Sequence, residues 1–580
     1  MIVYRPLAVH SPQTTLRSVS FGMNRSSALL RFPSSVALVL LLFGRAFGQD
    51  PEATNQSKEQ ITAAQTLIGL EFDDSELELM LPKLKGNRKS YEALRQFPIG
   101  NEALPSLRFD PLPPDWESGD AERPSVWSNQ ESPVGPVDIE DLAFESIGQL
   151  AARLRSGQIT STALTEMYLE RLKRFGPKLA CVVTLTEERA LAQARKADEE
   201  IAAGAYRGPL HGIPYGAKDL LAVRGYKTTW GAAPYKDQEI DENATVIEKL
   251  DQAGAVLVAK LSLGALAWGD VWYGGKTRNP WNLDQGSSGS SAGSASATAA
   301  GLVGFSIGSE TWGSIVSPST RCGVTGLRPT FGRISRAGAM TLSWSMDKLG
   351  PICRTVEDCA MVLDAIGGSD AKDPTAVDRP FHFDAARSLQ GLRVGYLANA
   401  FDEKNANDQA TLATLRELGV DLMPFDLPDD PRVPSLSIIL NAEAAAAFDD
   451  LTRSGRDSEL VRQIENAWPN VFRASRFIPA VEYIQANRVR QMLIQEMDTL
   501  FESMDVYVAP TFGGNNLLIT NLTGHPCVVT PNGFNENGSP TSISFIGALF
   551  NEEAALRLAK AYQDATEHHL ARPPLFSVEP

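Results

Sequence analysis

The architecture of this chain is set by two glycine- and serine-rich stretches, Gly286-Ser-Ser-Gly-Ser-Ser-Ala-Gly-Ser294 and Gly308-Ser-Glu-Thr-Trp-Gly-Ser-Ile315. The first lies between apolar segments, so it is not interpreted as a flexible linker in spite of its composition. Glycines let a backbone approach a ligand closely and adopt positive φ. A glycine-rich turn that ends in serine can aim several backbone N–H groups at one point, where a developing oxyanion sits. The two stretches therefore favour a catalytic site built around serine.

A serine hydroxyl becomes a good nucleophile only when a base takes its proton. Histidine is the usual base, but none of the five histidines after residue 48 lies beside a G-x-S-x-G turn. A lysine can replace histidine when burial and hydrogen bonding lower its pKa from about 10.4 toward neutrality. Lys218 follows the apolar and glycine-rich segment 208–217, which suits a desolvated lysine. Lys218 is therefore the predicted base.

Together, these segments resemble the signature of the amidase signature family, a group of amidohydrolases with a Ser–cisSer–Lys triad. The family pattern G-x-P-x-x-x-K-D matches residues 212–219, its G-S-S-G-G-S-type loop matches 289–294, and its [DE]-T-x-G-S-I turn matches 310–315. In the family the relay serine precedes the nucleophile by 24 residues, which is the separation of Ser290 and Ser314. The resemblance runs from about residue 138 to the C-terminus.

The resemblance implies a role for each matching residue. Ser314 would be the nucleophile, Ser290 the relay and Lys218 the base, with no metal and no cofactor. The backbone N–H groups of the turn that contains the nucleophile would form the oxyanion hole. These are the N–H groups of Thr311, Trp312, Gly313 and Ser314. The side chains of Ser291 and Asp219 would support the site. The expected reaction is hydrolysis of a linear carboxamide through an acyl-enzyme, and its substrate is a small-molecule amide.

Two positions depart from the family pattern. Trp312 stands where glycine is common, and Ala292 replaces a common glycine of the serine-rich loop. Backbone donors need no particular side chain, so the oxyanion hole can tolerate Trp312. Two positions are open for its bulky indole: it points into the substrate channel, or it packs against a lid. Ala292 should be tolerated if its φ is negative.

The fold class follows mainly from the resemblance, which implies an α/β domain with a large twisted mixed sheet covered by helices on both faces. The residue pattern agrees with it. Residues 147–154 and 162–176 have helical apolar spacing, and Ser146 and Gly157 are suitable end residues for the first. The apolar runs 254–260 and 505–511 resemble buried strands, and the helical stretch 187–203 alternates with them.

The N-terminus has the pattern of a signal peptide. Arg25 and Arg31 precede the apolar run 36–43, and Ala46 and Gly48 suit a cut before Gln49. The run is shorter than the roughly 20 residues of a membrane span. We expect residues 1–48 to be removed, with Met23 as an alternative start, and the mature protein to be periplasmic or secreted without a stable membrane span.

Two further regions are expected after the signal peptide. Residues 49–137 read as a mostly helical or irregular extension, ending in a Pro-, Ser- and acid-rich linker or wrapping arm, and residues 138–580 as the catalytic domain. The formal charge of −16 argues against a direct grip on nucleic acid. The five cysteines and six histidines show no metal-binding spacing. His211, His525 and Cys322 are expected to be structural, and a Cys353–Cys359 bridge stays open.

Two other functions remain open at this point. The same signature occurs in the A subunit of glutamyl-tRNA(Gln) amidotransferase, a glutaminase that serves a partner subunit. A signal peptide speaks against that function, as does Val316, where those subunits commonly carry arginine. The other alternative is an inactive amide-binding scaffold. The sequence leaves open the identity of the amide and the oligomeric state, with a homodimer among the alternatives.

Overall fold

The computed structural model describes residues 57–96, 99–103, 105, 107–113, 123–129, 138–428 and 432–576. The predicted signal peptide, residues 1–48, and the alternative start at Met23 lie outside these residues. Within the described part of the chain, no helix is both long enough and apolar enough to cross a membrane.

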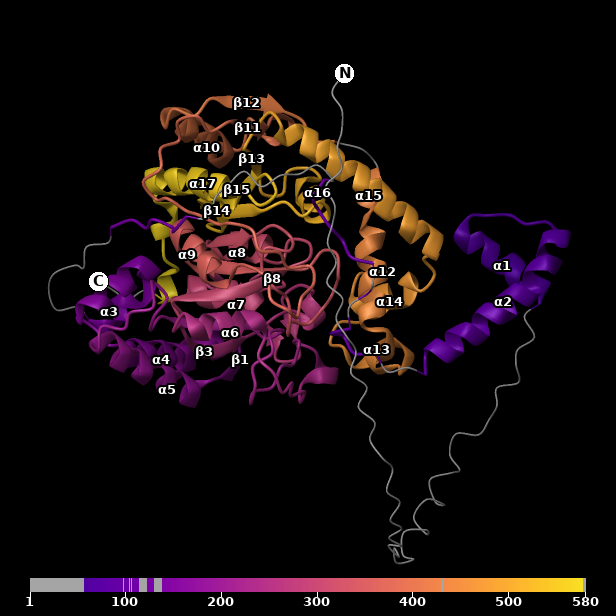
Figure 1. Ribbon diagram of the computed structural model, residues 1–580, viewed down its shortest axis with the longest axis horizontal. Helices are drawn as coiled ribbons and strands as arrows, with labels where there is room; N and C mark the ends of the chain where they lie inside the picture. Colours follow the sequence, from indigo (N-terminus) through magenta and orange to yellow (C-terminus); the bar gives the residue numbers. More distant parts are fainter. Residues whose placement is uncertain are drawn as a thin grey trace, which may run out of the picture.

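One mixed sheet of eleven strands forms the centre of the molecule (Figure 1). In spatial order the strands are β1 (Val182–Leu185), β3 (Val256–Leu261), β2 (Pro214–Lys218), β8 (Phe305–Glu310), β10 (Lys348–Cys353), β9 (Thr325–Arg328), β14 (Cys527–Phe534), β15 (Pro540–Gly547), β13 (Val506–Pro510), β11 (Val394–Leu397) and β12 (Leu422–Phe425). Two small hairpins, β4 (Val271–Trp272) with β5 (Gly275–Lys276) and β6 (Arg278–Asn279) with β7 (Asn282–Gly286), lie outside it.

Seventeen α-helices are present among the described residues, and several of them pack on this sheet. They are α1 (Lys58–Ile68), α2 (Asp74–Leu94), α3 (Ile147–Ser156), α4 (Ser161–Leu179), α5 (Glu187–Ala202), α6 (Thr245–Gln252), α7 (Ala292–Ala299), α8 (Val316–Cys322), α9 (Val356–Ile366), α10 (Ala406–Glu417), α11 (Arg432–Ser435), α12 (Ser437–Ala447), α13 (Asp449–Arg453), α14 (Trp468–Ser475), α15 (Ala480–Phe501), α16 (Asn516–Leu522) and α17 (Glu552–Thr566). The predicted class, an α/β protein with a large mixed sheet covered by helices, is confirmed.

Local sequence signals explain where several elements begin and end. The Ser146 side chain accepts a hydrogen bond from the Gln149 N–H and so caps α3, and Gly157 ends that helix with φ +73°. Strand β3 starts at Val256, two residues after the predicted start, because the Gly254 and Ala255 N–H groups still bond back to Asp251 and Leu250 of α6. Every residue of β2, β3, β8, β9 and β10 is buried, and for β3 the apolar run 254–260 predicts this.

The described parts of the N-terminal extension contain a helical hairpin and segments that follow the body of the molecule. Helices α1 and α2 project from one side in Figure 1. Farther along, Phe109 lies edge-on to Phe331, with ring centroids 5.0 Å apart, and Pro111 is buried. Val126 pairs with the 383–385 segment through two backbone hydrogen bonds of 2.7 and 2.9 Å. These described segments therefore behave as a wrapping arm.

The cysteines do not form a disulfide. All five are buried free thiols, and Cys353 and Cys359, for which a bridge stayed open, are unbridged. Cys322 belongs to a small apolar cluster with Ile315, Val324 and Ile352. It is therefore a packed core thiol, as expected.

Candidate functional site

The site forms where two parallel strands end. Strands β2 and β8 are neighbours, and Ala217 of β2 pairs with Ile307 of β8. Lys218 is the last residue of β2 and has no exposed surface. The register therefore places its side chain beside Ser309, near the end of β8, and in front of the loop that precedes α7.

Lys218 is surrounded by serine oxygens. Its Nζ lies 2.8 Å from Ser290 Oγ, 3.1 Å from Ser291 Oγ and 2.9 Å from Ser309 Oγ. Burial lowers the pKa of Lys218 well below its usual value of 10.5, although Asp347 and Glu310 act in the opposite direction. A neutral amine keeps a lone pair that can accept a proton from a neighbouring hydroxyl. The burial of Lys218 therefore favours the neutral amine over the charged one, and its hydroxyl neighbours lie within reach of that amine.

The serine-rich loop is held against the nucleophile turn by its backbone. The Gly289–Ser290 peptide bond is cis, and Ser290 is fully buried. The next residue, Ser291, donates its backbone N–H to the Ser314 carbonyl at 3.0 Å. Its hydroxyl accepts the Ser309 N–H at 3.1 Å and donates to the Ser309 carbonyl at 3.0 Å. Ser291 thus links the base, the loop and the end of β8.

Ser314 lies in a tight turn between β8 and α8. Gly313 has φ +86°, a conformation that favours glycine. None of the hydrogen bonds among the described residues uses the N–H groups of residues 311–314, so these donors are free for a ligand. In the same residues, the Ser314 and Ser290 hydroxyls are not directly bonded to each other. Catalytic hydrogen bonds are often long in a free enzyme and tighten only with substrate.

Glu310 fixes this turn, a role that the sequence analysis did not assign. One oxygen of its carboxylate accepts the N–H groups of Ile315 and Val316 at 2.8 and 3.0 Å. The other oxygen accepts from Arg328 and Asn521, each at 2.8 Å. Burial alone would raise its pKa, but the Arg328 guanidinium lowers the pKa of Glu310 to about 2. The acidic position of the [DE]-T-x-G-S-I turn was the available signal.

Asp347 is a second residue that sequence reasoning missed. Its Oδ1 accepts the Thr311 hydroxyl at 2.6 Å, and its Oδ2 accepts the N–H groups of Leu342 and Ser343 at 2.8 and 2.9 Å. Burial raises the pKa of this carboxyl group. Asp347 therefore connects the nucleophile turn to the 341–347 loop, and no local sequence pattern marks such a long-range contact.

Asp219 lies apart from the serine cluster. Its Oδ1 is 2.8 Å from Lys260 Nζ, both side chains are fully buried, and its Oδ2 accepts the Thr229 N–H at 2.9 Å. This ion pair ties the end of β2 to β3 and the 228–229 segment. The arrangement agrees with the structural role expected for Asp219.

The sequence also singles out three other residues, His211, His525 and Trp312. His211 lies 3.0 Å from Glu200, and His525 bonds to Thr523 at 2.8 Å. Burial lowers the pKa of His525 to about 3, so it stays neutral. Trp312 is 43% exposed and does not line the large cavity described below.

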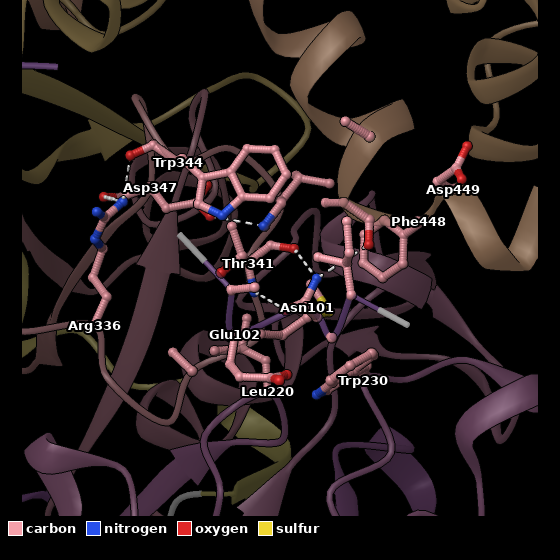
Figure 2. A pocket seen from close by; sticks show the side chains of 18 of the residues that line it. Asn101, Glu102, Leu220, Trp230, Arg336, Thr341, Trp344, Asp347, Phe448 and Asp449 are labelled. Carbon is pink, nitrogen blue, oxygen red and sulfur yellow. Dashed lines mark hydrogen bonds between the residues drawn. The ribbon is translucent and has the colours of Figure 1, made fainter. Parts of the chain in front are cut away.

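A cavity of about 1520 Å³ opens beside this cluster (Figure 2). Ser309 and Thr311 line it, and Ser309 Oγ lies 2.9 Å from Lys218 Nζ. Lys218, Ser290 and Ser314 are not among the residues that line it. Its walls combine aromatic and charged side chains, including Trp230, Tyr235, Trp344, Phe448, Arg336, Asp347 and Asp449. Pockets for drug-sized ligands measure about 300 to 1,000 Å³, so this cavity has room for a large substrate.

Three comparisons with known proteins agree with one another. The family model described as Amidase matches residues 163–519. The A subunit of glutamyl-tRNA(Gln) amidotransferase from Methylococcus capsulatus is 34% identical over 482 residues, which cover 74% of this chain and 98% of that protein. The crystal structure of peptide amidase from Stenotrophomonas maltophilia is 29% identical, with a TM-score of 0.68 over 76% of this chain and all of that one.

Proposed function

This chain belongs to the amidase signature family and is an amide-hydrolysing enzyme, and we propose that it cleaves a linear carboxamide with Ser314 as nucleophile, Ser290 as relay and Lys218 as base. The observation that carries this assignment is the 2.8 Å contact between a fully buried Lys218 and Ser290 Oγ. The bond from the Ser291 N–H to the Ser314 carbonyl holds the relay loop on the nucleophile turn.

The reaction would begin with two linked proton transfers. Ser290 passes its hydroxyl proton to neutral Lys218 and takes the proton of Ser314, whose oxygen attacks the amide carbonyl carbon. The unpaired N–H groups of Thr311, Trp312, Gly313 and Ser314 would hold the oxyanion. When the C–N bond breaks, the proton returns through Ser290 to the leaving amine. Water then attacks the acyl-enzyme by the same route and releases the acid and Ser314.

Four other side chains would keep this machinery in place. Ser291 and Ser309 orient the Lys218 amine, since both hydroxyls lie within 3.1 Å of Nζ. Glu310 fixes the N–H groups that follow Ser314. Asp219 would support the site only through its ion pair with Lys260.

The proposal is tested by ammonia release from primary carboxamides and glutamine, with purified protein starting at residue 49. We expect turnover of at least one amide, and a loss of about a thousandfold or more in Ser314→Ala. Ser503→Ala, an exposed serine after α15, is the matched control and should keep full activity. Turnover that survives in Ser314→Ala would overturn the assignment of the nucleophile.

A glutaminase that serves a partner subunit is the second candidate, because the similarity to the amidotransferase A subunit covers 98% of that protein. Export of this chain, which we propose from its signal-like N-terminus, would remove it from cytosolic tRNA. We also propose that the enzyme acts on a small-molecule amide without direct contact to nucleic acid. Hydrolysis of glutamine alone, together with stable association with a second subunit, would favour the amidotransferase function.

A further inference from the structure

A segment of the N-terminal extension crosses the substrate cavity. Residues 99–103, here called the strap, line the cavity, and Figure 2 shows Asn101 between Thr341 and Phe448. The side-chain amide of Asn101 both donates a hydrogen bond to the backbone of Thr341 and accepts one from it. Its Nδ2 donates to the Thr341 carbonyl at 2.9 Å, and its Oδ1 accepts the Thr341 N–H at 2.7 Å. A longer contact of 3.4 Å runs from Nδ2 to the Ala447 carbonyl.

Among the described residues, the hydrogen bonds from the strap to the cavity walls come from Asn101. Its neighbours Gly100, Glu102 and Ala103 are exposed, and Ile99 is 69% exposed. The strap therefore buries little apolar surface, and its position depends largely on the amide group of one side chain. Segments with few buried contacts open at low free-energy cost, which is what a cavity cover needs for substrate entry.

The wall that receives Asn101 has its own supports. Asp347 accepts the N–H groups of Leu342 and Ser343. Glu443 of α12 accepts the Ser343 hydroxyl at 2.6 Å and the Ser345 hydroxyl at 2.7 Å. Loss of the Asn101 side chain should therefore release the strap and leave the 341–347 loop in place.

The strap and the start of the nucleophile turn line the same cavity. Thr311 and Ser309 line it, and the Ser309 hydroxyl lies 2.9 Å from Lys218 Nζ. Trp230, Phe448 and Asn101 line it as well. A ligand the size of glutamine or acetamide would fill only part of about 1520 Å³. A substrate that uses the whole cavity must have an extended acyl part.

We propose that the substrate is a carboxamide with an extended, partly aromatic acyl group, covered by the strap, and that Asn101 determines this specificity by holding the strap closed. The proposal rests on the proposed amidase function. The carboxamide end lies at Ser314, and the acyl chain runs past Thr311 toward Trp230 and Phe448. Remote contacts of this kind raise the kcat/KM of long substrates without acting on the reacting atoms.

The test compares acetamide with an N-benzoyl dipeptide amide, since both release ammonia and differ only in acyl size. In Asn101→Ala we expect kcat/KM for the dipeptide amide to fall about five- to tenfold, mainly through KM, as the loss of two hydrogen bonds implies. The value for acetamide should stay within about twofold. Asn87→Ala, the same change at an exposed position of α2, should alter neither. Equal changes for both amides, or no change, would overturn the inference.

A second measurement does not depend on turnover. Amide hydrogen exchange at Thr341 should be faster in Asn101→Ala than in the parent protein, because Asn101 Oδ1 accepts that N–H. Calorimetry with the dipeptide amide and Ser314→Ala protein should show tight binding that weakens by the same five- to tenfold when Asn101→Ala is added. If no amide is hydrolysed but this binding difference appears, the proposed chemistry fails and the strap inference stands. Unchanged exchange and unchanged binding would overturn the strap inference itself.

Discussion

The proposed mechanism depends on a lysine that must lose its charge. Lys218 has no exposed surface, and burial lowers its pKa well below 10.5, against the opposing influence of Asp347 and Glu310. The sequence analysis identified Lys218, Ser290 and Ser314 because all three fall in short patterns with fixed spacing. It did not identify Ser309 or Asp347, since their contacts to Lys218 and Thr311 join residues 91 and 36 positions apart.

In the proposed mechanism, the depressed pKa of Lys218 would determine the pH dependence of activity. The neutral amine would be the active form, so kcat/KM should rise as pH increases through the pKa of Lys218 and then level off. Lys218→Ala and Lys218→Arg should both lose about a hundredfold or more at every pH, because neither side chain can act as the base. A pH profile with Lys404→Ala, an exposed lysine, as control would check this. Substantial activity in Lys218→Arg would contradict a role as base.

At the level of elements, the nucleophile turn is positioned by the start of α8. Glu310, the last residue of β8, accepts the N–H groups of Ile315 and Val316 and pairs with Arg328 of β9 in full burial. One carboxylate thus joins two strands and a helix. Helix ends such as Ser146 and Gly157 could be predicted because their signals are local. The eleven-strand order could not be predicted from the residues alone, because neighbours such as β9 and β14 are far apart in the chain.

Removal of the Glu310 charge should therefore weaken both stability and activity. Glu310→Gln leaves Arg328 buried without its partner, and the loss of one member of a buried pair costs about 3 to 5 kcal/mol in the free energy of unfolding. The pKa of Glu310 is about 2, below its usual 4.5, so its contribution is present above pH 4.5 and is lost as pH falls toward 2. Denaturant unfolding across that range, with exposed Glu482→Gln as control, measures this. Equal stability of Glu310→Gln and parent protein at pH 7 would contradict it.

At the level of the whole molecule, the extension is the part that sequence reasoning described least. Its Pro-rich and acidic composition predicted an extended linker or a wrapping arm, and the described segments contact the catalytic body through Phe109, Pro111 and Val126. Nothing local to Asn101 indicated that its side chain reaches the substrate cavity. Asn101 and Thr341 are 240 positions apart. Their contact depends on how the catalytic domain folds, and the sequence around Asn101 carries no information about that fold.

Export is the prediction that separates an independent amidase from a subunit of a cytosolic complex. Expression of the full chain in a Gram-negative host should yield periplasmic protein whose N-terminal sequence starts at Gln49. Ala46→Arg should block processing, because a small residue is needed three positions before the cut. Phe47→Arg should not block it, because the position two before the cut has no such size requirement. Intact mass and cell fractionation distinguish these results. An uncut cytosolic protein in all three cases would remove the argument against a glutaminase subunit, and association with a partner would then be the first property to test.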